Sequence, residues 1–350
     1  MSDSQRLSSL DTLRGIAILM VIGFHTSIPF QLSSWHSKIL DFGNQGVQLF
    51  FLISAFTMCL MWESRKSELN QTKKFYIRRF MRIAPLYWLA ILFYFLISCF
   101  SNSHQSTLYQ ILLNTLFLHG FSPVAINSAV PGGWSIAVEM SFYALFPILV
   151  SFKLKPVSLL IFALMSYLVL GILITGLIMS IYSPPPIFIY YSLLTQFPIF
   201  LIGMIVYQLC NNSQKGGNLF MIAITLIWLI FAFVGKYGYE INTRPFFWLQ
   251  VFLFALMMYY FFKLQINFGV LSQFGTLSYS MYLFHFAIID FMVLYIPPAW
   301  KESGFTYLGF FAMVTLVSSL IANLSHLTLE RWSTLAAKNL ILILERVKPI

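Results

Sequence analysis

The sequence predicts an all-α membrane protein that crosses the bilayer many times. Of its 350 residues, 59% are hydrophobic and only 9% are charged, and a soluble domain with so few charges could not keep its surface hydrated. Apolar runs of at least about 18 residues, the length that crosses a bilayer core, recur along almost the whole chain. They leave no stretch long enough for a second domain, so we expect one membrane domain over residues 1–350.

The expected architecture is ten transmembrane helices plus one short helix that is re-entrant or interfacial. The spans are expected near residues 12–31, 45–62, 84–100, 134–152, 157–178, 190–209, 219–235, 246–262, 274–296 and 306–328. No small-residue cleavage site follows the first apolar run, so we expect it to remain as the first helix rather than to be removed as a signal peptide. The apolar segment at 106–120 is too short to cross and is assigned as the re-entrant or interfacial helix.

The distribution of basic residues orients these spans. With both termini in the cytoplasm, sixteen of the 21 Lys and Arg residues lie in inside segments, as the positive-inside rule requires. The same asymmetry accounts for the net charge of +10 without a nucleic-acid partner. The three cysteines stand singly and offer neither a disulfide pair nor a metal cluster, so we expect no metal. The oligomeric state is left open.

Two ionisable residues share one face of the first expected helix. Arg14 and His25 are eleven residues apart, which is three helical turns plus about 20°, so their side chains point the same way about 16 Å apart along the axis. Such groups are costly in a membrane unless they face a partner or a cavity. His25 is suited to act as a general base near neutral pH. Alternatively, Arg14 reaches the lipid headgroups and His25 hydrogen-bonds a neighbouring helix.

Glu139 is a second ionisable residue inside an expected span, about five residues from its start. A carboxylate there needs a partner, and it could orient an imidazole and stabilise its protonated form. A structural ion pair between helices is the alternative. Trp134 and Ser135 open the same helix after two glycines, and Ser135 could serve there as a helix cap.

Arg79 and Arg82 form an i, i+3 pair just before the third expected span, where Pro85 suits the first turn of a helix. Two forked guanidinium groups at this spacing can converge on a phosphate. The alternative is that they set the topology and bind anionic lipid headgroups. Tyr282 and His285 lie at helical spacing on another span, where core hydrogen bonding is the alternative to a binding role.

The motifs carrying these residues occur in the order typical of one membrane enzyme family. They are "LDTLRGIA" with His25 eleven residues after Arg14, "GVQLFFLISAF", "RRFMRIAPLYW", "WSIAVEMSFYALFP", "LSYSMYLFH" and the terminal Glu330. In this joint order the chain resembles acyltransferase family 3, the integral-membrane acyltransferases. Many relatives carry an additional hydrolase-like domain after the last span; here we expect the membrane unit to act alone or with a separate partner.

The resemblance implies transfer of an acyl group, most often acetyl, from cytoplasmic acyl-CoA to a hydroxyl of a sugar at the inner membrane of a bacterium. The implied catalytic residues are His25, Arg14 and Glu139. The implied donor-binding residues are Arg14, Arg79 and Arg82, and the implied substrate-binding residues are Trp134, Ser135, Tyr143, Tyr282 and His285. Direct attack by the acceptor hydroxyl, with His25 as base, is the preferred route; an acyl-histidine intermediate is the alternative.

Two other classes of function remain open from the residues. In a transporter, His25, Glu139 and His285 would relay protons while the arginines bind an anionic or glycan solute. In a scaffold or flippase of envelope assembly, His25 would be dispensable. The sequence carries neither a Walker loop nor a G-x-G-x-x-G motif, so a nucleotide-bearing donor would be held by arginines and helix ends.

Overall fold

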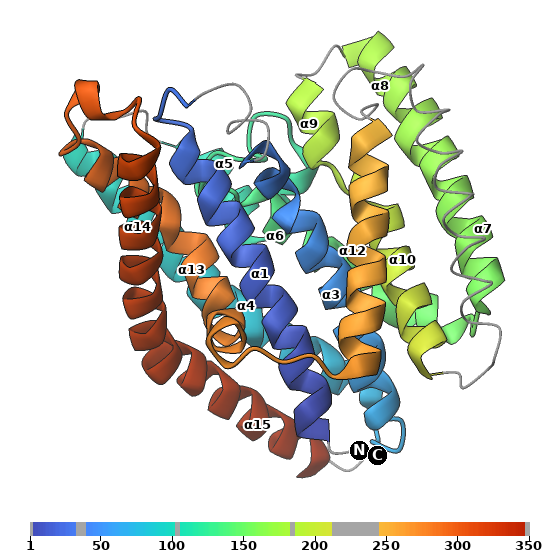
Figure 1. The fold of residues 1–350 in the computed structure, drawn as a ribbon. Coiled ribbons are helices and arrows are strands. Elements are labelled where there is room, and N and C mark those ends of the chain that lie inside the picture. Colours follow the sequence, from blue (N-terminus) through green and yellow to red (C-terminus); the bar gives the residue numbers. More distant parts are fainter. Residues whose placement is uncertain (1–2, 33–39, 102–105, 183–185, 212–244, 347–350) are drawn as a thin grey trace. The chain divides into compact units, whose positions relative to one another are not determined.

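The computed structural model describes residues 3–32, 40–101, 106–182, 186–211 and 245–346, which form helices and connecting loops without any strand (Figure 1). Within this part of the chain, seven helical stretches are long and apolar enough to cross a membrane. They are Phe42–Ser64, Gln71–Phe100, Trp134–Ser151, Ile187–Asn211, Phe247–Leu264, Gly269–Val293 and Gly304–Arg346. The predicted all-α polytopic fold is therefore confirmed.

The seven stretches coincide with seven of the ten expected spans, and each of the other three differs for its own reason. The expected span at 12–31 falls in the 25-residue helix α1 (Asp3–Ser27), whose ionisable residues lower its apolar character. The expected span at 157–178 is a helix interrupted by a π-helical stretch. The expected span at 219–235 lies outside the described residues.

The chain divides into two compact units, which are described separately. Unit 1 comprises residues 1–27, 33–60 and 152–276, and unit 2 comprises residues 28–32, 61–151 and 277–350. The helices of unit 1 are α1, η1 (Phe42–Gln45), most of α3 (Gly46–Ser64), α7 (Pro156–Ser166), the π-helix η3 (Tyr167–Ile174), α8 (Thr175–Tyr182), α9 (Pro186–Tyr191), α10 (Leu193–Asn211), α12 (Pro245–Leu264) and the start of α13 (Gly269–Val293).

Close backbone contacts at glycines hold unit 1 together. A Cβ added to Gly15 on α1 would lie 1.9 Å from the carbonyl oxygen of Leu271 at the start of α13, so no other residue fits there without moving a helix. A Cβ on Gly203 of α10 would likewise lie 2.5 Å from the carbonyl oxygen of Leu52 on α3. Small residues thus let these apolar helices approach closely, as membrane helices commonly do.

The remaining helices belong to unit 2. They are α4 (Gln71–Ser101), α5 (Leu108–Thr115), η2 (His119–Phe121), α6 (Trp134–Ser151), the rest of α13, η5 (Pro298–Trp300), α14 (Gly304–Ser325), the π-helix η6 (His326–Glu330) and α15 (Arg331–Arg346). α5 has only eight residues, too few to cross a bilayer. A capping box, in which Thr107 and Gln110 bond each other's backbone N–H groups, begins it.

The expectation that Pro85 lies in the first turn of a helix is wrong, because α4 begins at Gln71 and runs through the proline. Proline removes one helical hydrogen bond, and membrane helices tolerate this loss where neighbouring side chains supply donors. The hydroxyl of Tyr279 on α13 donates to the carbonyl of Ile83, 2.8 Å away and two residues before the proline. The basic residues before Pro85 are therefore arranged on a helix and not in a loop.

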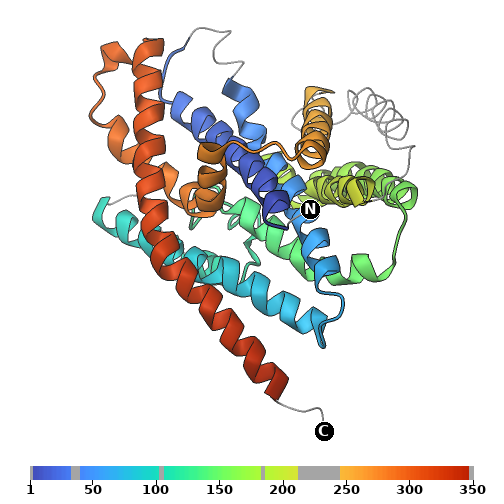
Figure 2. The same ribbon diagram turned by 60° about the horizontal axis from the view of Figure 1, so that its bottom comes forward.

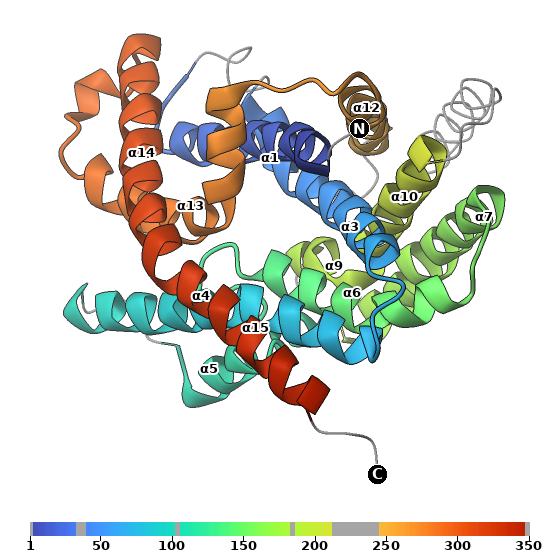
Figure 3. The ribbon, with the colours of Figure 1, turned by 90° about the horizontal axis from the view of Figure 1, so that it is seen from below.

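The end of the chain forms a helix that the sequence analysis did not predict. α14 continues through η6 into α15 as one helical path with a bend, drawn in orange to red (Figure 2). Seen from below, α15 crosses α4 (Figure 3). Lys74 on α4, only 4% exposed, pairs with Glu345 on α15, so the last helix is fastened to the basic beginning of α4.

Candidate functional site

Arg14 is held by two polar partners within unit 1. Its Nη1 donates to Oδ1 of Asp11 at 2.5 Å, one turn earlier on α1, and its Nη2 donates to the hydroxyl of Thr57 on α3 at 2.8 Å. The Thr57 hydroxyl donates in turn to the carbonyl of Ile53. Arg14 and Asp11 are 15% and 20% exposed. The guanidinium is thus held by one group of its own helix and one group of α3 instead of extending freely to lipid headgroups.

His25 lies on the same unbroken helix as Arg14, because α1 runs from Asp3 to Ser27. The helix therefore confirms the geometry on which the shared face was predicted. The His25 ring is half-buried and meets Phe24 edge to face at 5.0 Å between ring centroids. An imidazole and a guanidinium lie along one side of one helix, separated by three turns.

Within unit 2, Glu139 and Tyr143 on α6 meet Arg79 of α4. The Tyr143 hydroxyl donates to Oε1 of Glu139 at 2.5 Å. The Arg79 guanidinium carbon stands 5.3 Å from the Tyr143 ring centroid and 5.8 Å from that of Phe75, which is cation–π geometry. A cation, a phenol and a carboxylate therefore form a connected chain from α4 to α6.

The neighbouring arginines of α4 differ in their surroundings. Arg78 places Nη2 2.8 Å from both carboxylate oxygens of Glu68 and is engaged in this pair. Arg82, one turn beyond Arg79, is exposed. Arg79 and Arg82 are the predicted i, i+3 pair, and Arg78 is occupied by a protein carboxylate. Arg78 is therefore paired with a protein carboxylate, whereas Arg79 lies over two aromatic rings and Arg82 is exposed.

Ser135 and Tyr282 meet at the turn that precedes α6. The Ser135 hydroxyl lies 3.0 Å from the carbonyl oxygen of Gly132 and 2.9 Å from the Tyr282 hydroxyl, and Tyr282 donates to the same carbonyl at 2.9 Å. Ser135 does not occupy the N-cap position, because α6 begins one residue earlier, at Trp134. Trp134, buried at 5% exposure, begins the helix beside it.

His285 completes this group on α13. It is fully buried, and its Nδ1 lies 2.8 Å from the carbonyl of Tyr282 one turn earlier. Since a carbonyl can only accept, Nδ1 carries a proton, and in a neutral ring Nε2 is then the acceptor. The expected pair of Tyr282 and His285 is thus confirmed as neighbours on one helix, with both rings buried.

Sequence reasoning left His119 out of the site, although it is fully buried beside it. Its Nε2 lies 3.0 Å from the carbonyl of Gly133 and 3.2 Å from the Tyr87 hydroxyl, which donates to Asn114 at 2.7 Å. His119 therefore holds one carbonyl of the Gly132–Gly133 turn while Tyr282 holds the other. The signal available in the sequence was a histidine in the short segment at 106–120, but its partner is a backbone carbonyl, which no pattern reveals.

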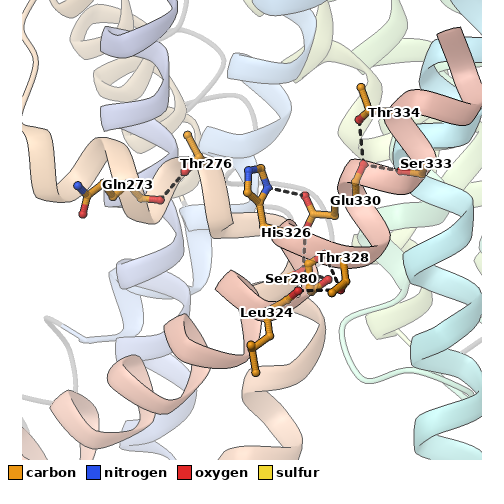
Figure 4. Close-up of polar contacts among 10 residues, drawn as sticks. Gln273, Thr276, Ser280, Leu324, His326, Thr328, Glu330, Ser333 and Thr334 are labelled. Atoms are coloured by element: carbon orange, nitrogen blue, oxygen red, sulfur yellow. Dashed lines mark hydrogen bonds and ion pairs between the residues drawn. The ribbon is translucent and has the colours of Figure 1, made fainter.

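Glu330 gathers polar groups near the start of α15 (Figure 4). Its Oε1 accepts from the Ser280 hydroxyl at 2.7 Å, and its Oε2 lies 3.4 Å from Nδ1 of His326. Glu330 therefore links η6 to α13 through its hydrogen bond with Ser280 and is not a free interfacial charge.

The predicted residues fall into two groups. Arg14 and His25 belong to unit 1, and the other eight belong to unit 2. Unit 2 brings Arg79, Tyr143 and Glu139 together, and separately Ser135, Tyr282 and His285. Among the described residues no three His, Cys, Asp or Glu side chains cluster in a way that could hold a metal ion.

Comparison with known proteins points to one enzyme class. The sequence model of a family described as an acyltransferase domain matches residues 7–323. The chain is 27% identical over 323 residues to the peptidoglycan O-acetyltransferase OatA of Listeria monocytogenes, covering 80% of this chain and 49% of that protein. It is 26% identical over 331 residues to a putative O-acetyltransferase of Staphylococcus aureus strain COL, covering 83% and 52%.

A third relative is matched over most of its own length. The chain is 24% identical over 293 residues to a putative acetyltransferase of Acidianus two-tailed virus, covering 78% of this chain and 80% of that protein. The chain spans about half the length of the bacterial relatives. No solved structure matches.

Proposed function

The chain belongs to acyltransferase family 3, and we propose that this membrane O-acetyltransferase takes its acetyl group from acetyl-coenzyme A and delivers it to a hydroxyl of a surface polysaccharide or lipid-linked glycan in the bacterial cytoplasmic membrane. The observation that carries the proposal is α1, one continuous helix with a fixed Arg14 and a half-buried His25 on the same side. A glycan acceptor is supported by the relative named as a peptidoglycan O-acetyltransferase.

We propose that arginine side chains bind the acyl donor. Coenzyme A carries phosphates, and forked guanidinium groups bind phosphate with two parallel hydrogen bonds. Arg82 is exposed and Arg79 is held over two aromatic rings, whereas Arg78 is taken up by Glu68. We therefore assign phosphate binding to Arg79 and Arg82, with Arg14 as the third cation, and give Arg78 a structural role.

The chemical step is assigned to His25. The imidazole takes the proton from the acceptor hydroxyl as its oxygen attacks the thioester carbon. The new C–O bond forms, the C–S bond breaks, and the imidazolium returns the proton to the departing thiolate, so the histidine ends the cycle neutral. An acyl-histidine route would instead place the acetyl group on the ring first, and it would leave a labelled enzyme when the acceptor is omitted.

The acceptor end is proposed at the group formed by Ser135, Tyr282 and His285. These side chains supply hydroxyl groups and one imidazole acceptor, which are the polar groups that orient sugar hydroxyls in otherwise apolar pockets. Trp134 and Tyr143 would add aromatic surface for a sugar ring. Glu139, hydrogen-bonded by Tyr143, would balance the charge that develops on an imidazole.

Transfer and transport are separated by one experiment on the purified protein. The protein is reconstituted into vesicles and given acetyl-coenzyme A labelled in the acetyl group, together with a lipid-linked disaccharide as acceptor probe. The proposal predicts covalently labelled disaccharide. Uptake of either compound without covalent label would instead support a proton-coupled carrier and overturn the proposal.

Two variants test which arginines bind acetyl-coenzyme A. Replacement of Arg82 by Gln should raise the KM for acetyl-coenzyme A while kcat changes little, because the exposed cation binds the donor and takes no part in the chemical step. Replacement of Arg78 by Gln is the matched control on the adjacent position, since its partner is Glu68. A selective KM effect at Arg78 instead of Arg82 would contradict the assignment of the donor site.

A further inference from the structure

α15 has three chemically different faces. Ser333 and Ala337, one turn apart, are buried on the side of α4. Arg331 and Lys338 lie seven residues apart and form a polar stripe. The third face carries large exposed apolar side chains, namely Trp332 at 58%, Leu340 at 45% and Ile343 at 57%, which lie at least about 100° around the helix from Arg331 and Lys338. An amphipathic helix with a covered face, a charged face and an open apolar face needs one more apolar neighbour.

The length of the helix shows where α15 must lie. The continuous helical stretch from Gly304 to Arg346 has 43 residues, or about 65 Å at 1.5 Å per residue, whereas a bilayer core is about 30 Å thick. The 22 residues of α14 already suffice to cross it. The π-helical turn η6 then bends the path, as such turns do, and α15 leaves the direction of α14.

The charges of α15 match the boundary of a bilayer. Arg331, Lys338 and Arg346 are exposed, and the acidic Glu345 is already paired with Lys74 of α4. Exposed cations beside an open apolar face are the pattern of helices that lie in the plane of the membrane, with acyl chains against one side and lipid phosphates against the other. A protein partner would need an apolar surface of its own, and nothing about the charged stripe requires one.

We propose that α15 lies along the membrane surface, with Trp332, Leu340 and Ile343 inserted at the boundary between headgroups and acyl chains. The occupant of its open apolar face is lipid. Through the Lys74–Glu345 pair, this surface helix also fixes the depth at which the beginning of α4 lies. The inference concerns attachment to the bilayer and holds whether or not the assigned chemistry is correct.

The test uses the full-length protein with spin labels on opposite sides of α15. Cys99 is the exposed cysteine and is replaced by Ser, whereas Cys59 and Cys210 are buried and remain. Single cysteines are then placed at Leu340 and Ile343 on the apolar face and at Thr334 and Lys338 on the polar face. Each labelled protein is reconstituted into nanodiscs of phosphatidylcholine and phosphatidylglycerol, and collisions with oxygen and with a water-soluble nickel chelate are measured.

The proposal predicts opposite preferences on the two faces. Labels at Leu340 and Ile343 should collide more with oxygen, which concentrates in lipid, and labels at Thr334 and Lys338 should collide more with the nickel chelate. Equal nickel accessibility on both faces would place α15 in water and overturn the proposal. Labels at Leu340 and Ile343 that are shielded from both reagents would also overturn it, because a protein surface would then cover the face. Trp332 offers a replacement site if one of these variants does not fold.

Discussion

Arg14 on α1 donates to the hydroxyl of Thr57 on α3 across 2.8 Å, although the two residues are 43 positions apart in the chain. Asp11 binds the other terminal nitrogen at 2.5 Å. An arginine has five N–H donors, so two fixed contacts leave further donors for a ligand. The guanidinium is therefore oriented by the protein itself, and if Arg14 binds the acyl donor as proposed, this orientation reduces the entropy lost on binding.

The contribution of the Arg14–Thr57 hydrogen bond can be tested without replacing the arginine. Replacement of Thr57 by Val keeps the shape and deletes one hydrogen bond, which is worth about 1 kcal/mol, so kcat/KM for acetyl-coenzyme A should fall roughly fivefold. Thr26→Val on α1 is the control, because that hydroxyl donates to carbonyls of its own helix. The measurement is kcat/KM for acetyl-coenzyme A, from steady-state kinetics of the two purified variants. An unchanged kcat/KM in Thr57→Val would show that Arg14 is not positioned by this contact.

Tyr143 has two contacts that substitutions can separate. Tyr143→Phe keeps the ring under Arg79 and deletes the donor to Glu139. Because a hydrogen bond to a charged group is worth about 1.5–3 kcal/mol, kcat should fall at least tenfold while the KM for acetyl-coenzyme A stays the same. Tyr143→Leu also removes the ring and should raise that KM. If both variants raise KM alone, Glu139 has no part in the chemical step.

A substitution at Gly132 tests the turn that precedes α6. Its φ of +76° belongs to the left-handed region, and an added Cβ would lie 2.9 Å from the Tyr282 hydroxyl. Gly132→Ala should lower stability by about 1–3 kcal/mol, visible as a lower thermal unfolding midpoint in detergent. Gly304→Ala is the matched control, since no atom lies within 4 Å of its added Cβ. Equal midpoints for the two variants would contradict the described turn.

His119 gives a pH dependence of stability. It lies outside the membrane-spanning segments, and burial lowers its pKa, opposed by hydrogen bonds to the backbone of Gly133 and Leu113. The folded protein thus holds fewer protons than the unfolded chain, so the stability from His119 is complete above the unfolded pKa of about 6.5 and is lost as the pH falls through the lower folded value.

The corresponding measurement is the thermal unfolding midpoint between pH 7.5 and 5. It should fall with pH in the wild-type protein, and His119→Gln should reduce this slope while lowering the midpoint at pH 7.5. A wild-type slope that His119→Gln leaves unchanged would show that other groups cause the acid sensitivity.

Much of the fold followed from composition and periodicity. Seven expected spans coincide with apolar helices, because a run of about 20 apolar residues has few alternatives to a transmembrane helix. The continuous helix of α1 and the pairing of Tyr282 with His285 also followed from a spacing of 3.6 residues per turn.

Other features depend on contacts that no local pattern contains. α4 runs through Pro85, and Tyr279, almost 200 residues later, donates to the carbonyl of Ile83 in the turn before the proline. His119 belongs beside the site because its ring contacts the backbone carbonyl of Gly133. α15 was missed because its apolar residues are interrupted by charges and suit a surface helix better than a span. Hydropathy identifies segments, whereas such partners are set by the tertiary fold.

The role of His25 in the transfer step is measured directly by the rate at which label passes from acetyl-coenzyme A to the lipid-linked disaccharide. His25→Ala should lower this rate by at least about 100-fold, as expected for loss of a general base, with an unchanged gel-filtration profile. Ser27→Ala, two residues away on α1, should keep the full rate. A His25→Ala protein that transfers label as fast as the Ser27→Ala protein would contradict the account.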